Sequence, residues 1–397
     1  MNKNIKLWII LLFVIILFNS SACKEREIAM NEIINLPPLK DQFRDFFIIG
    51  NIFNPIDVAG GAFLNEKLLR HYNVLTAENH MKPNALSGAV RGQYNWTTAD
   101  NMVNTALAAG FKVVGHTLLW HSQIPTWQQN LRTDNTTPAA TVLEWMKTYI
   151  TDVVTRYKGK VYLWDVLNEV FPDPPQGGYA SSSWRDVMRR DTNNGNPWYI
   201  KIGADFVYEG FKAARLADPD AILYYNDYNL NMPVKALMVH NMVRDINEQW
   251  KNDPAYDEKK LIQGIGMQSH HNTSVPASQI RDSLTLFKPL GVEIAISELD
   301  VLAQSFQQFQ QSGGEGPRKH SQTTVTAQGL ETQARLYGEY FTVFLEFADI
   351  IERVTFWGLT DDLSWRSVGL PLPFDPQGVA KPAYFKIIEA LEEFKAR

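Results

Sequence analysis

Eight short apolar runs, rich in β-branched residues, alternate with amphipathic stretches, and this alternation restricts the possible folds more than any other feature. The runs that could form strands are 46–51, 73–79, 111–120, 161–169, 221–228, 261–270, 292–300 and 353–361. The segments between them carry apolar residues at helical spacing, as in 138–159. Eight such alternations in a chain of 397 residues favour a parallel (β/α)8 barrel over an open sheet. The sequence therefore predicts an α/β protein with a single TIM-barrel domain over 37–397.

The N-terminus has a different character. A short basic start leads into the apolar run LWIILLFVIILF, which is too short for a good membrane span and is typical of a secretory signal. Cys23, the one cysteine, stands where such a signal is cut. The stretch resembles a bacterial lipoprotein signal. This resemblance implies a signal peptide over 1–22, a lipid on Cys23 and a tether over 23–36, with plain secretion as the alternative.

That reading predicts a protein exported across the inner membrane and lipid-anchored in the cell envelope, in the periplasm or on the cell surface. The anchor would be its only contact with a membrane. The formal net charge is −5 and no basic stripe is visible, which disfavours nucleic acid as a partner. The 11 Trp and 15 Tyr suit a surface that stacks on flat apolar faces. We expect a monomer.

Polar side chains gather where the predicted strands end, which is the edge where such barrels build their sites. Two long loops, 171–197 and 301–327, leave the same edge. The polar and aromatic residues at these strand ends are Glu78, Asn79, Lys82, His116, Trp120, His121, Gln123, Asn168, Glu169, Asn226, Tyr228, Gln268, His270, Glu298, Asp300, Trp357, Asp361 and Trp365.

Two glutamates stand out among them. Glu169 ends the fourth predicted strand and Glu298 the seventh, so a closed barrel would place them across its mouth from each other. Either one alone could equally be a helix cap or half of a buried ion pair. Two carboxylates that flank one bond are the minimum equipment for glycoside hydrolysis, in which one group holds a proton and the other stays ionised. The pair therefore predicts a glycosidase.

The motifs WDVLNE, SELD, HTLLWHSQ, ENHMKP, YNDYN and WGLTDDLSW together resemble the endo-β-1,4-xylanases of glycoside hydrolase family 10. The resemblance runs from about residue 40 to the end, with a motif on nearly every strand. It implies a retaining double displacement of xylan or xylo-oligosaccharides. Glu169 would be the acid/base and Glu298 the nucleophile, with their carboxyls about 5–5.5 Å apart. It implies no cofactor.

The resemblance also assigns the contacts to the two sugar units nearest the cleavage point on the glycone side. The residues that would contact their hydroxyls or form their walls are Glu78, Asn79, Lys82, His116, Gln123, Trp120, Trp357 and Trp365.

Five further residues receive roles from the resemblance. Asn168 would bond the 2-hydroxyl of the reacting sugar. Gln268 and His270 would orient the nucleophile, and Asp300 would support His270. Tyr228 would lie on the leaving-group side.

Two departures from the family pattern are small. Ser297 stands where the family usually has Thr and keeps the hydroxyl, and His80 falls at a variable position without a role. A retaining β-1,4-glucanase on the same barrel remains an alternative. The walls expected of Lys82, Trp357 and Trp365 favour xylan, because they leave little room for the hydroxymethyl group of glucose. A lipoprotein that binds xylan without cutting it is a second alternative.

A metal site is a weaker interpretation of the same residues. His116, His121 and His270 could suggest zinc, but zinc ligands usually come in close local pairs. The spacing of HTLLWH at a strand end gives a poor pair. Hydrogen bonding to sugar is the favoured interpretation, and we expect no metal.

Overall fold

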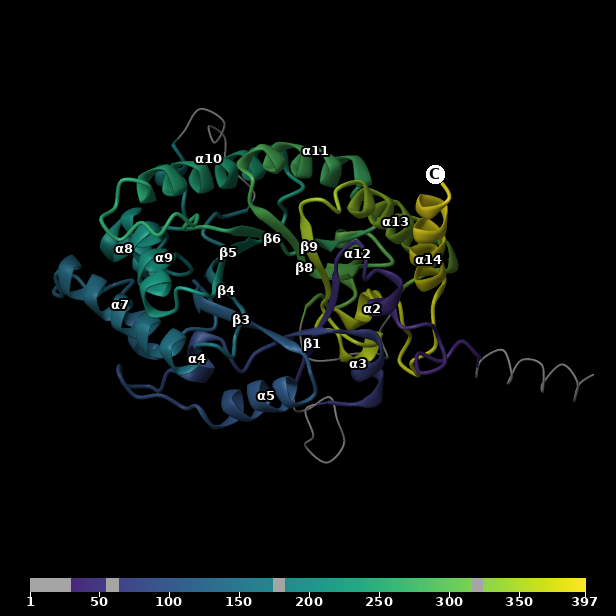
Figure 1. The fold of residues 1–397 in the computed structure, drawn as a ribbon, viewed down its shortest axis with the longest axis horizontal. Coiled ribbons are helices and arrows are strands. Elements are labelled where there is room, and N and C mark those ends of the chain that lie inside the picture. The colour runs from purple at the N-terminus through teal and green to yellow at the C-terminus, as the bar shows by residue number, and fades with distance from the viewer. Residues whose placement is uncertain (1–29, 55–63, 174–182, 316–323) are drawn as a thin grey trace, which may run out of the picture.

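The computed structural model describes residues 30–54, 64–173, 183–315 and 324–397, and these form a closed parallel barrel (Figure 1). In the sheet, the neighbours run β6-β5-β4-β3-β2-β1-β9-β8, and pairing of β6 with β8 closes the ring. The predicted (β/α)8 fold is confirmed. The barrel strands are β1 (Ile48–Phe53), β2 (Val74–Ala77), β3 (Lys112–Leu119), β4 (Leu163–Asn168), β5 (Ile222–Asp227), β6 (Gly264–Met267), β8 (Glu293–Val301) and β9 (Ile351–Phe356).

Helices surround the barrel because parallel neighbours need crossover connections. In α7, residues Met146, Ile150, Val153 and Val154 are buried at helical spacing, as the sequence predicts. The longer helices are α5 (Thr97–Ala108), α7 (Ala139–Arg156), α9 (Asp205–Ala217), α10 (Pro233–Trp250), α11 (Ala277–Phe287), α13 (Ala327–Glu346) and α14 (Pro382–Lys395). The shorter ones are α2 (Leu39–Gln42), α3 (Glu66–His71), α4 (Pro83–Leu86), α6 (Thr126–Asn130), α8 (Pro197–Ile202), α12 (Phe306–Gln311) and the 3-10 turns η3 (Trp184–Asp186), η4 (Lys288–Leu290), η6 (Asp361–Leu363) and η7 (Ser367–Gly369).

The barrel interior is packed below the mouth. A small apolar cluster takes its members from strands around the ring, including β2 and β8, which are not neighbours in the sheet. Such side chains meet only inside the barrel. Its buried members are Val74, Val114, Leu163, Tyr224 and Ala295. The barrel is therefore solid at this level, and a ligand has to bind above it.

Two predicted strands differ from the observed ones. The predicted run 261–270 divides into β6 and the two-residue strand β7 (His270–His271), because Ser269 has a φ of 61° that interrupts the ladder. Strand β7 then pairs with β8, which sets His270 opposite Asp300. The predicted run 353–361 leaves the sheet after Phe356, so Trp357 stands just beyond the end of β9.

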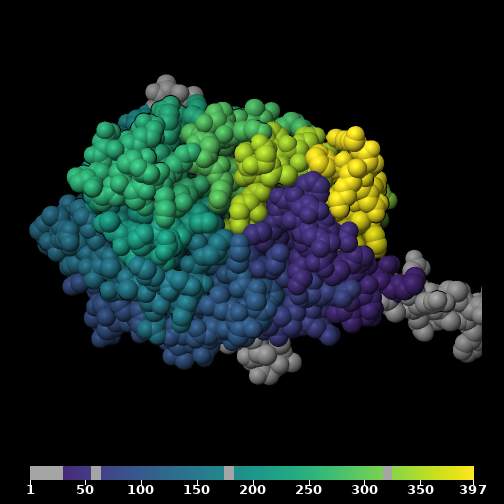
Figure 2. Space-filling model, viewed as in Figure 1, coloured from purple at the N-terminus to yellow at the C-terminus, as the bar shows by residue number. Residues whose placement is uncertain are grey.

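The N-terminal segment packs on the barrel. The predicted tether, 23–36, is described only from residue 30, and there Ile33 is fully buried. The Ile33 amide donates to the Gly378 carbonyl at 2.8 Å, and Glu32 forms an antiparallel bridge with Val379. Figure 2 shows this purple segment near the yellow C-terminal helix. The tether prediction is therefore wrong for 31–36, because the apolar side chains there belong to the core.

The predicted signal peptide and Cys23 lie outside the described residues. Within the described residues, no helix has the length and apolar character needed to span a membrane.

Candidate active site

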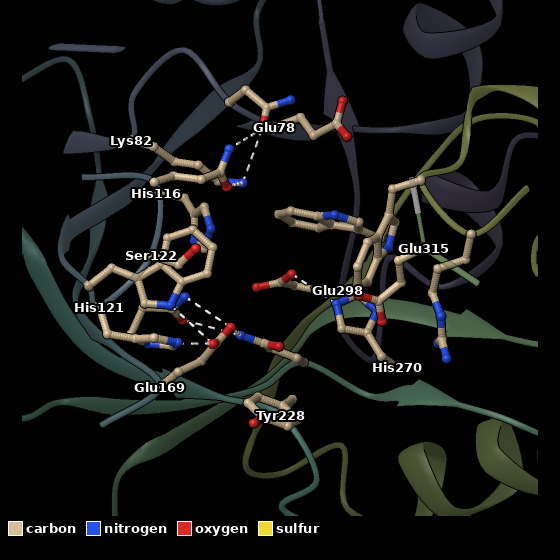
Figure 3. A pocket seen from close by; sticks show the side chains of 18 of the residues that line it. Glu78, Lys82, His116, His121, Ser122, Glu169, Tyr228, His270, Glu298 and Glu315 are labelled. Carbon is tan, nitrogen blue, oxygen red and sulfur yellow. Dashed lines mark hydrogen bonds and ion pairs between the residues drawn. The ribbon is translucent and has the colours of Figure 1, made fainter. Parts of the chain in front are cut away.

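A cavity of about 1220 Å³ opens at the carboxyl ends of the strands. Figure 3 shows side chains from several strand ends pointing into it. It brings together every residue predicted to contact sugar or to react, while Asp300 is fully buried behind it. The predicted residues that line the cavity are Glu78, Asn79, Lys82, His116, Trp120, Gln123, Asn168, Glu169, Tyr228, Gln268, His270, Glu298, Trp357 and Trp365.

Glu298 lies on β8, is 5% exposed and lines the cavity. His270 Nε2 donates to its Oε2 at 3.1 Å, and Asn226 Nδ2 donates to its Oε1 at 2.7 Å. Burial alone would raise the pKa of this carboxyl. The hydrogen bond from His270, the charges of His116 and His270, and the bond from Asn226 outweigh burial and leave the pKa below its ordinary value. Glu298 is thus ionised at neutral pH.

His270 lies between two carboxylates. Its Nδ1 is 2.8 Å from Asp300 Oδ2, and Asp300 also binds Arg366 Nη1 at 2.6 Å and Trp365 Nε1 at 3.2 Å. Burial by itself lowers the pKa of His270, but the charges and hydrogen bonds of Asp300 and Glu298 raise it to about 9. The pKa of Asp300 is lowered, because His270 and Arg366 outweigh its burial. An imidazolium therefore connects Asp300 to Glu298, and a supporting role for Asp300 stays a prediction.

Glu169 directly follows β4 and has a φ of 56°, in the left-handed region. Its amide donates to the Asn226 carbonyl at 2.9 Å, and Arg189 Nε donates to its carbonyl at 2.9 Å. Trp120 Nε1 donates to Oε2 of its carboxyl group at 3.0 Å. The surrounding structure thus holds an uncommon backbone conformation that aims this side chain into the cavity.

Gln268, which was predicted to orient Glu298, instead contacts the other glutamate. Its Nε2 donates to Glu169 Oε1 at 2.9 Å and to Asn168 Oδ1 at 3.2 Å. The place beside Glu298 is taken by Asn226, whose Oδ1 accepts from Ser297 Oγ at 2.6 Å. Ser297 stands where Thr was expected, and the hydroxyl that both residues carry holds the Asn226 amide that binds Glu298.

One rim of the cavity is a network of polar side chains. Lys82 Nζ donates to Gln123 Oε1 at 2.7 Å and to Asn79 Oδ1 at 3.1 Å. Asn54 Nδ2 donates to Glu78 Oε2 at 2.7 Å. Burial lowers the pKa of Lys82 more than the nearby Glu298, Glu78 and Glu169 raise it. Such a rim offers closely spaced donors and acceptors to a ligand rich in hydroxyl groups.

Aromatic rings form the walls. His270 meets the Trp365 ring edge-on at 5.1 Å and the Trp357 ring at 6.2 Å. The Lys82 ammonium lies 5.1 Å from the centre of the Trp120 ring. His116 is held in the wall by Asp165, whose Oδ2 lies 2.9 Å from His116 Nδ1.

Sequence reasoning missed several lining residues, most of them from loops whose course a strand pattern does not give. His121 was expected to hydrogen-bond sugar in preference to a metal, but it was given no specific contact. Its Nδ1 lies 3.9 Å from Glu169 Oε2, and burial lowers its pKa to about 3. In the part of the chain that the structure describes, no group of three His, Cys, Asp or Glu side chains is placed to hold a metal ion. The lining residues without a predicted role are Asn54, His121, Ser122, Arg189, Asn194, Asn229, Asn272, Phe306, Glu315, Leu363 and Arg366.

Comparison with known proteins places this site in a family. The model of glycosyl hydrolase family 10 matches residues 38–390. Endo-1,4-beta-xylanase A of Thermotoga maritima is 35% identical over 376 residues, which are 92% of this chain and 32% of the relative. The endo-1,4-beta-xylanase of Geobacillus stearothermophilus is 34% identical over 362 residues, which are 89% of this chain and 98% of the relative.

A solved structure agrees with these matches. The crystal structure of a bacterial Ig-like domain containing GH10 xylanase from termite gut superposes with a TM-score of 0.86 at 49% identity. The match covers 92% of this chain and 80% of that one. The present chain spans about a third of the length of the Thermotoga maritima and Thermotoga neapolitana relatives.

Proposed function

The chain belongs to glycosyl hydrolase family 10, and on that premise we propose that it is an endo-β-1,4-xylanase that cleaves internal β-1,4-xylosidic bonds of xylan with retention of configuration. One observation carries the proposal: two glutamates share one cavity in different surroundings. Glu298 is bound by His270 and Asn226 and kept ionised, while Glu169 accepts from Trp120 and Gln268. Two carboxyl groups with separate tasks are what a double displacement requires.

In the first step, Glu298 attacks the anomeric carbon and forms an ester with the sugar, while Glu169 protonates the departing glycosidic oxygen. In the second step, Glu169 removes a proton from water, which attacks the anomeric carbon and releases Glu298. The charge on Glu298 disappears in the ester, yet His270 keeps its partner Asp300 at 2.8 Å. The imidazolium is therefore never left buried without a counter-charge.

Asn168 is oriented to contact the reacting sugar. Asn226 and Gln268 both donate to its Oδ1, at 2.9 and 3.2 Å, so its Nδ2 is the end left to act as a donor. That Nδ2 lies 3.2 Å from Glu169 Oε1. We assign it to the 2-hydroxyl of the reacting sugar, a bond that strengthens in the transition state of glycosidases.

Xylan is favoured over glucan by the walls of the cavity. Trp357 is almost fully buried beside His116, with their ring centres 5.5 Å apart, and Trp365 packs on His270. Together with the buried ammonium of Lys82, these rings limit the space for a hydroxymethyl group on the bound sugar.

Product analysis tests the proposal. The full chain is incubated with xylan and with carboxymethylcellulose, and the Glu298→Ala variant serves as the control. We expect short xylo-oligosaccharides from xylan alone, and none from the variant. Cleavage mainly of carboxymethylcellulose would replace xylan by a glucan, and binding of insoluble xylan without cleavage would make the protein a receptor.

We also propose that the chain is exported and anchored in the cell envelope through a lipid on Cys23. Support for this proposal comes from the N-terminal sequence, where the basic start and apolar run precede the one cysteine. A xylanase held at the envelope would act on xylan fragments that reach the cell.

A further inference from the structure

One exposed aromatic side chain lines the active-site cavity. Among the large apolar side chains that are exposed in the described residues, Phe306 is the one that also lines the cavity, and it is 46% exposed. A single exposed apolar side chain is common on protein surfaces, so the relevant observation is the place of this ring, which offers an apolar face to a ligand inside the cavity. Neither the family motifs nor the two catalytic glutamates use this residue.

The ring stands on a rigid support. Phe306 opens α12, whose start is fixed by Ser305: its hydroxyl accepts from the Gln308 amide at 3.3 Å, and the Gln308 side chain accepts from the Ser305 amide at 3.1 Å. One turn further on, Phe309 is fully buried against Leu302 and Val368. The two phenyl rings are 6.1 Å apart.

The support is tied to the catalytic wall. The Arg366 guanidinium lies 5.2 Å from the centre of the Phe309 ring and also binds Asp300 at 2.6 Å. The Ala303 amide donates to the Gly369 carbonyl at 2.9 Å. Figure 3 shows Glu315, from the same loop as Phe306, on the His270 side of the cavity and across from His121. The start of α12, which carries Phe306, is therefore connected to the wall that holds His270.

We propose that Phe306 forms a distal sugar subsite, in which its ring stacks on a xylosyl unit beyond the unit that reacts. This inference rests on the proposed xylanase function. A pyranose ring presents apolar C–H faces, and phenylalanine can bind such a face without a hydrogen-bonding group of its own. The contact would add affinity for long xylan chains. The polar rim of the cavity would still decide which arrangement of sugar hydroxyls is bound.

The test compares Phe306→Ala with Phe385→Ala in the full chain. Phe385 is a phenylalanine of similar exposure, 43%, which lies on α14 and outside the cavity. For Phe306→Ala we expect kcat/KM on xylohexaose to fall roughly three- to tenfold, which is what an aromatic contact contributes. The loss with an aryl xylobioside, which occupies fewer subsites, should be clearly smaller. Phe306→Trp should restore the xylohexaose rate, and Phe385→Ala should change neither substrate.

An unchanged rate of Phe306→Ala on xylohexaose would overturn the subsite, as would an equal loss with both substrates. If the wild-type chain failed to cut xylohexaose at all, the proposed function would fail, and this outcome is separate from the first two. The thermal midpoint of each variant shows that the fold is retained.

Discussion

At the scale of single residues, the site depends on a histidine that is charged where burial alone would make it neutral. His270 loses hydration, which lowers its pKa, but Asp300 and Glu298 hold it at about 9. The pKa of Glu298 is lowered in turn. The three side chains stabilise one another's charges. His270 therefore stays protonated and donates a hydrogen bond to Glu298, the proposed nucleophile, while Glu298 stays ionised.

This coupling predicts how stability depends on pH. Because the folded pKa of His270 is above the ordinary value of 6.5, its stabilisation is complete below about pH 6.5 and is lost as pH rises through about 9. Wild type should therefore exceed His270→Gln in free energy of unfolding by at most about 3 kcal/mol near pH 6, and by less at pH 9.5. Urea unfolding at several pH values measures the difference. A difference that grows with pH would contradict this assignment.

The contact between Asn226 and Glu298 could not be predicted from residue types alone. The sequence places Asn226 at the end of a strand beside other polar residues. It does not tell whether Asn226 or Gln268 reaches Glu298. That choice depends on the registers of the strands, and these shift between Asp165 and Leu167 in the β4–β5 pair. A shift of this kind changes which amides meet across the barrel mouth, and no local pattern records it.

At the scale of elements, Arg189 from the loop after β4 contacts Glu169, the proposed acid/base. Arg189 donates to the Glu169 carbonyl at 2.9 Å and to the Tyr228 hydroxyl at 2.5 Å. The Arg189 guanidinium therefore connects Glu169, whose backbone is in the left-handed region, to Tyr228, which is predicted to lie on the leaving-group side. A loop residue far from the motifs thus contributes to the position of the reacting proton.

We therefore expect Arg189→Met to lower kcat/KM on xylan by roughly tenfold or more, since small displacements of a catalytic group are costly. The loss should be smaller on an aryl xylobioside whose leaving group needs no proton. Arg190→Met is the matched control, because Arg190 is exposed and outside the cavity, and it should retain the wild-type rate. Equal losses on both substrates would mean that Arg189 acts in another way.

The strands were predictable to within a few residues because each is a buried run between helical patterns. The pairing of β7 with β8 was not, since it follows from the positive φ of Ser269, a conformation that serine rarely takes. The contributions of Phe306 and Arg189 were likewise hidden, because long loops obey no period. The motifs identified the two glutamates and most of the aromatic walls, and the loops add Phe306 and Arg189 to the cavity lining.

At the scale of the whole molecule, the first described residues are part of the domain. Ile33 is fully buried, and its segment pairs with the chain just before α14. Replacing it with alanine should lower the free energy of unfolding by about 2–5 kcal/mol, as is usual for a buried isoleucine. Met30, 59% exposed, is the control, and Met30→Ala should change it by less than about 0.5 kcal/mol.

Chemical denaturation of the two variants measures both values. If Ile33→Ala were as stable as Met30→Ala, the segment would be a tether after all.

The proposed anchor also belongs to the whole molecule, because it decides where the barrel works. Cys23→Ser removes the thiol that would carry the lipid, so the protein should move from the membrane fraction to the soluble fraction while its xylanase activity is retained. Fractionation of cells that express each form, followed by immunoblotting, measures the distribution. If Cys23→Ser stayed in the membrane fraction, the proposed lipid anchor on Cys23 would be wrong.

The most direct test of the central claim is to trap the covalent intermediate. The full chain is incubated with a 2-deoxy-2-fluoro-xylobioside that carries a good leaving group, digested and analysed by mass spectrometry. We expect one added disaccharide on the peptide that contains Glu298, and none in Glu298→Ala. A label on Glu169, or hydrolysis of xylan with inversion and no label, would contradict this expectation.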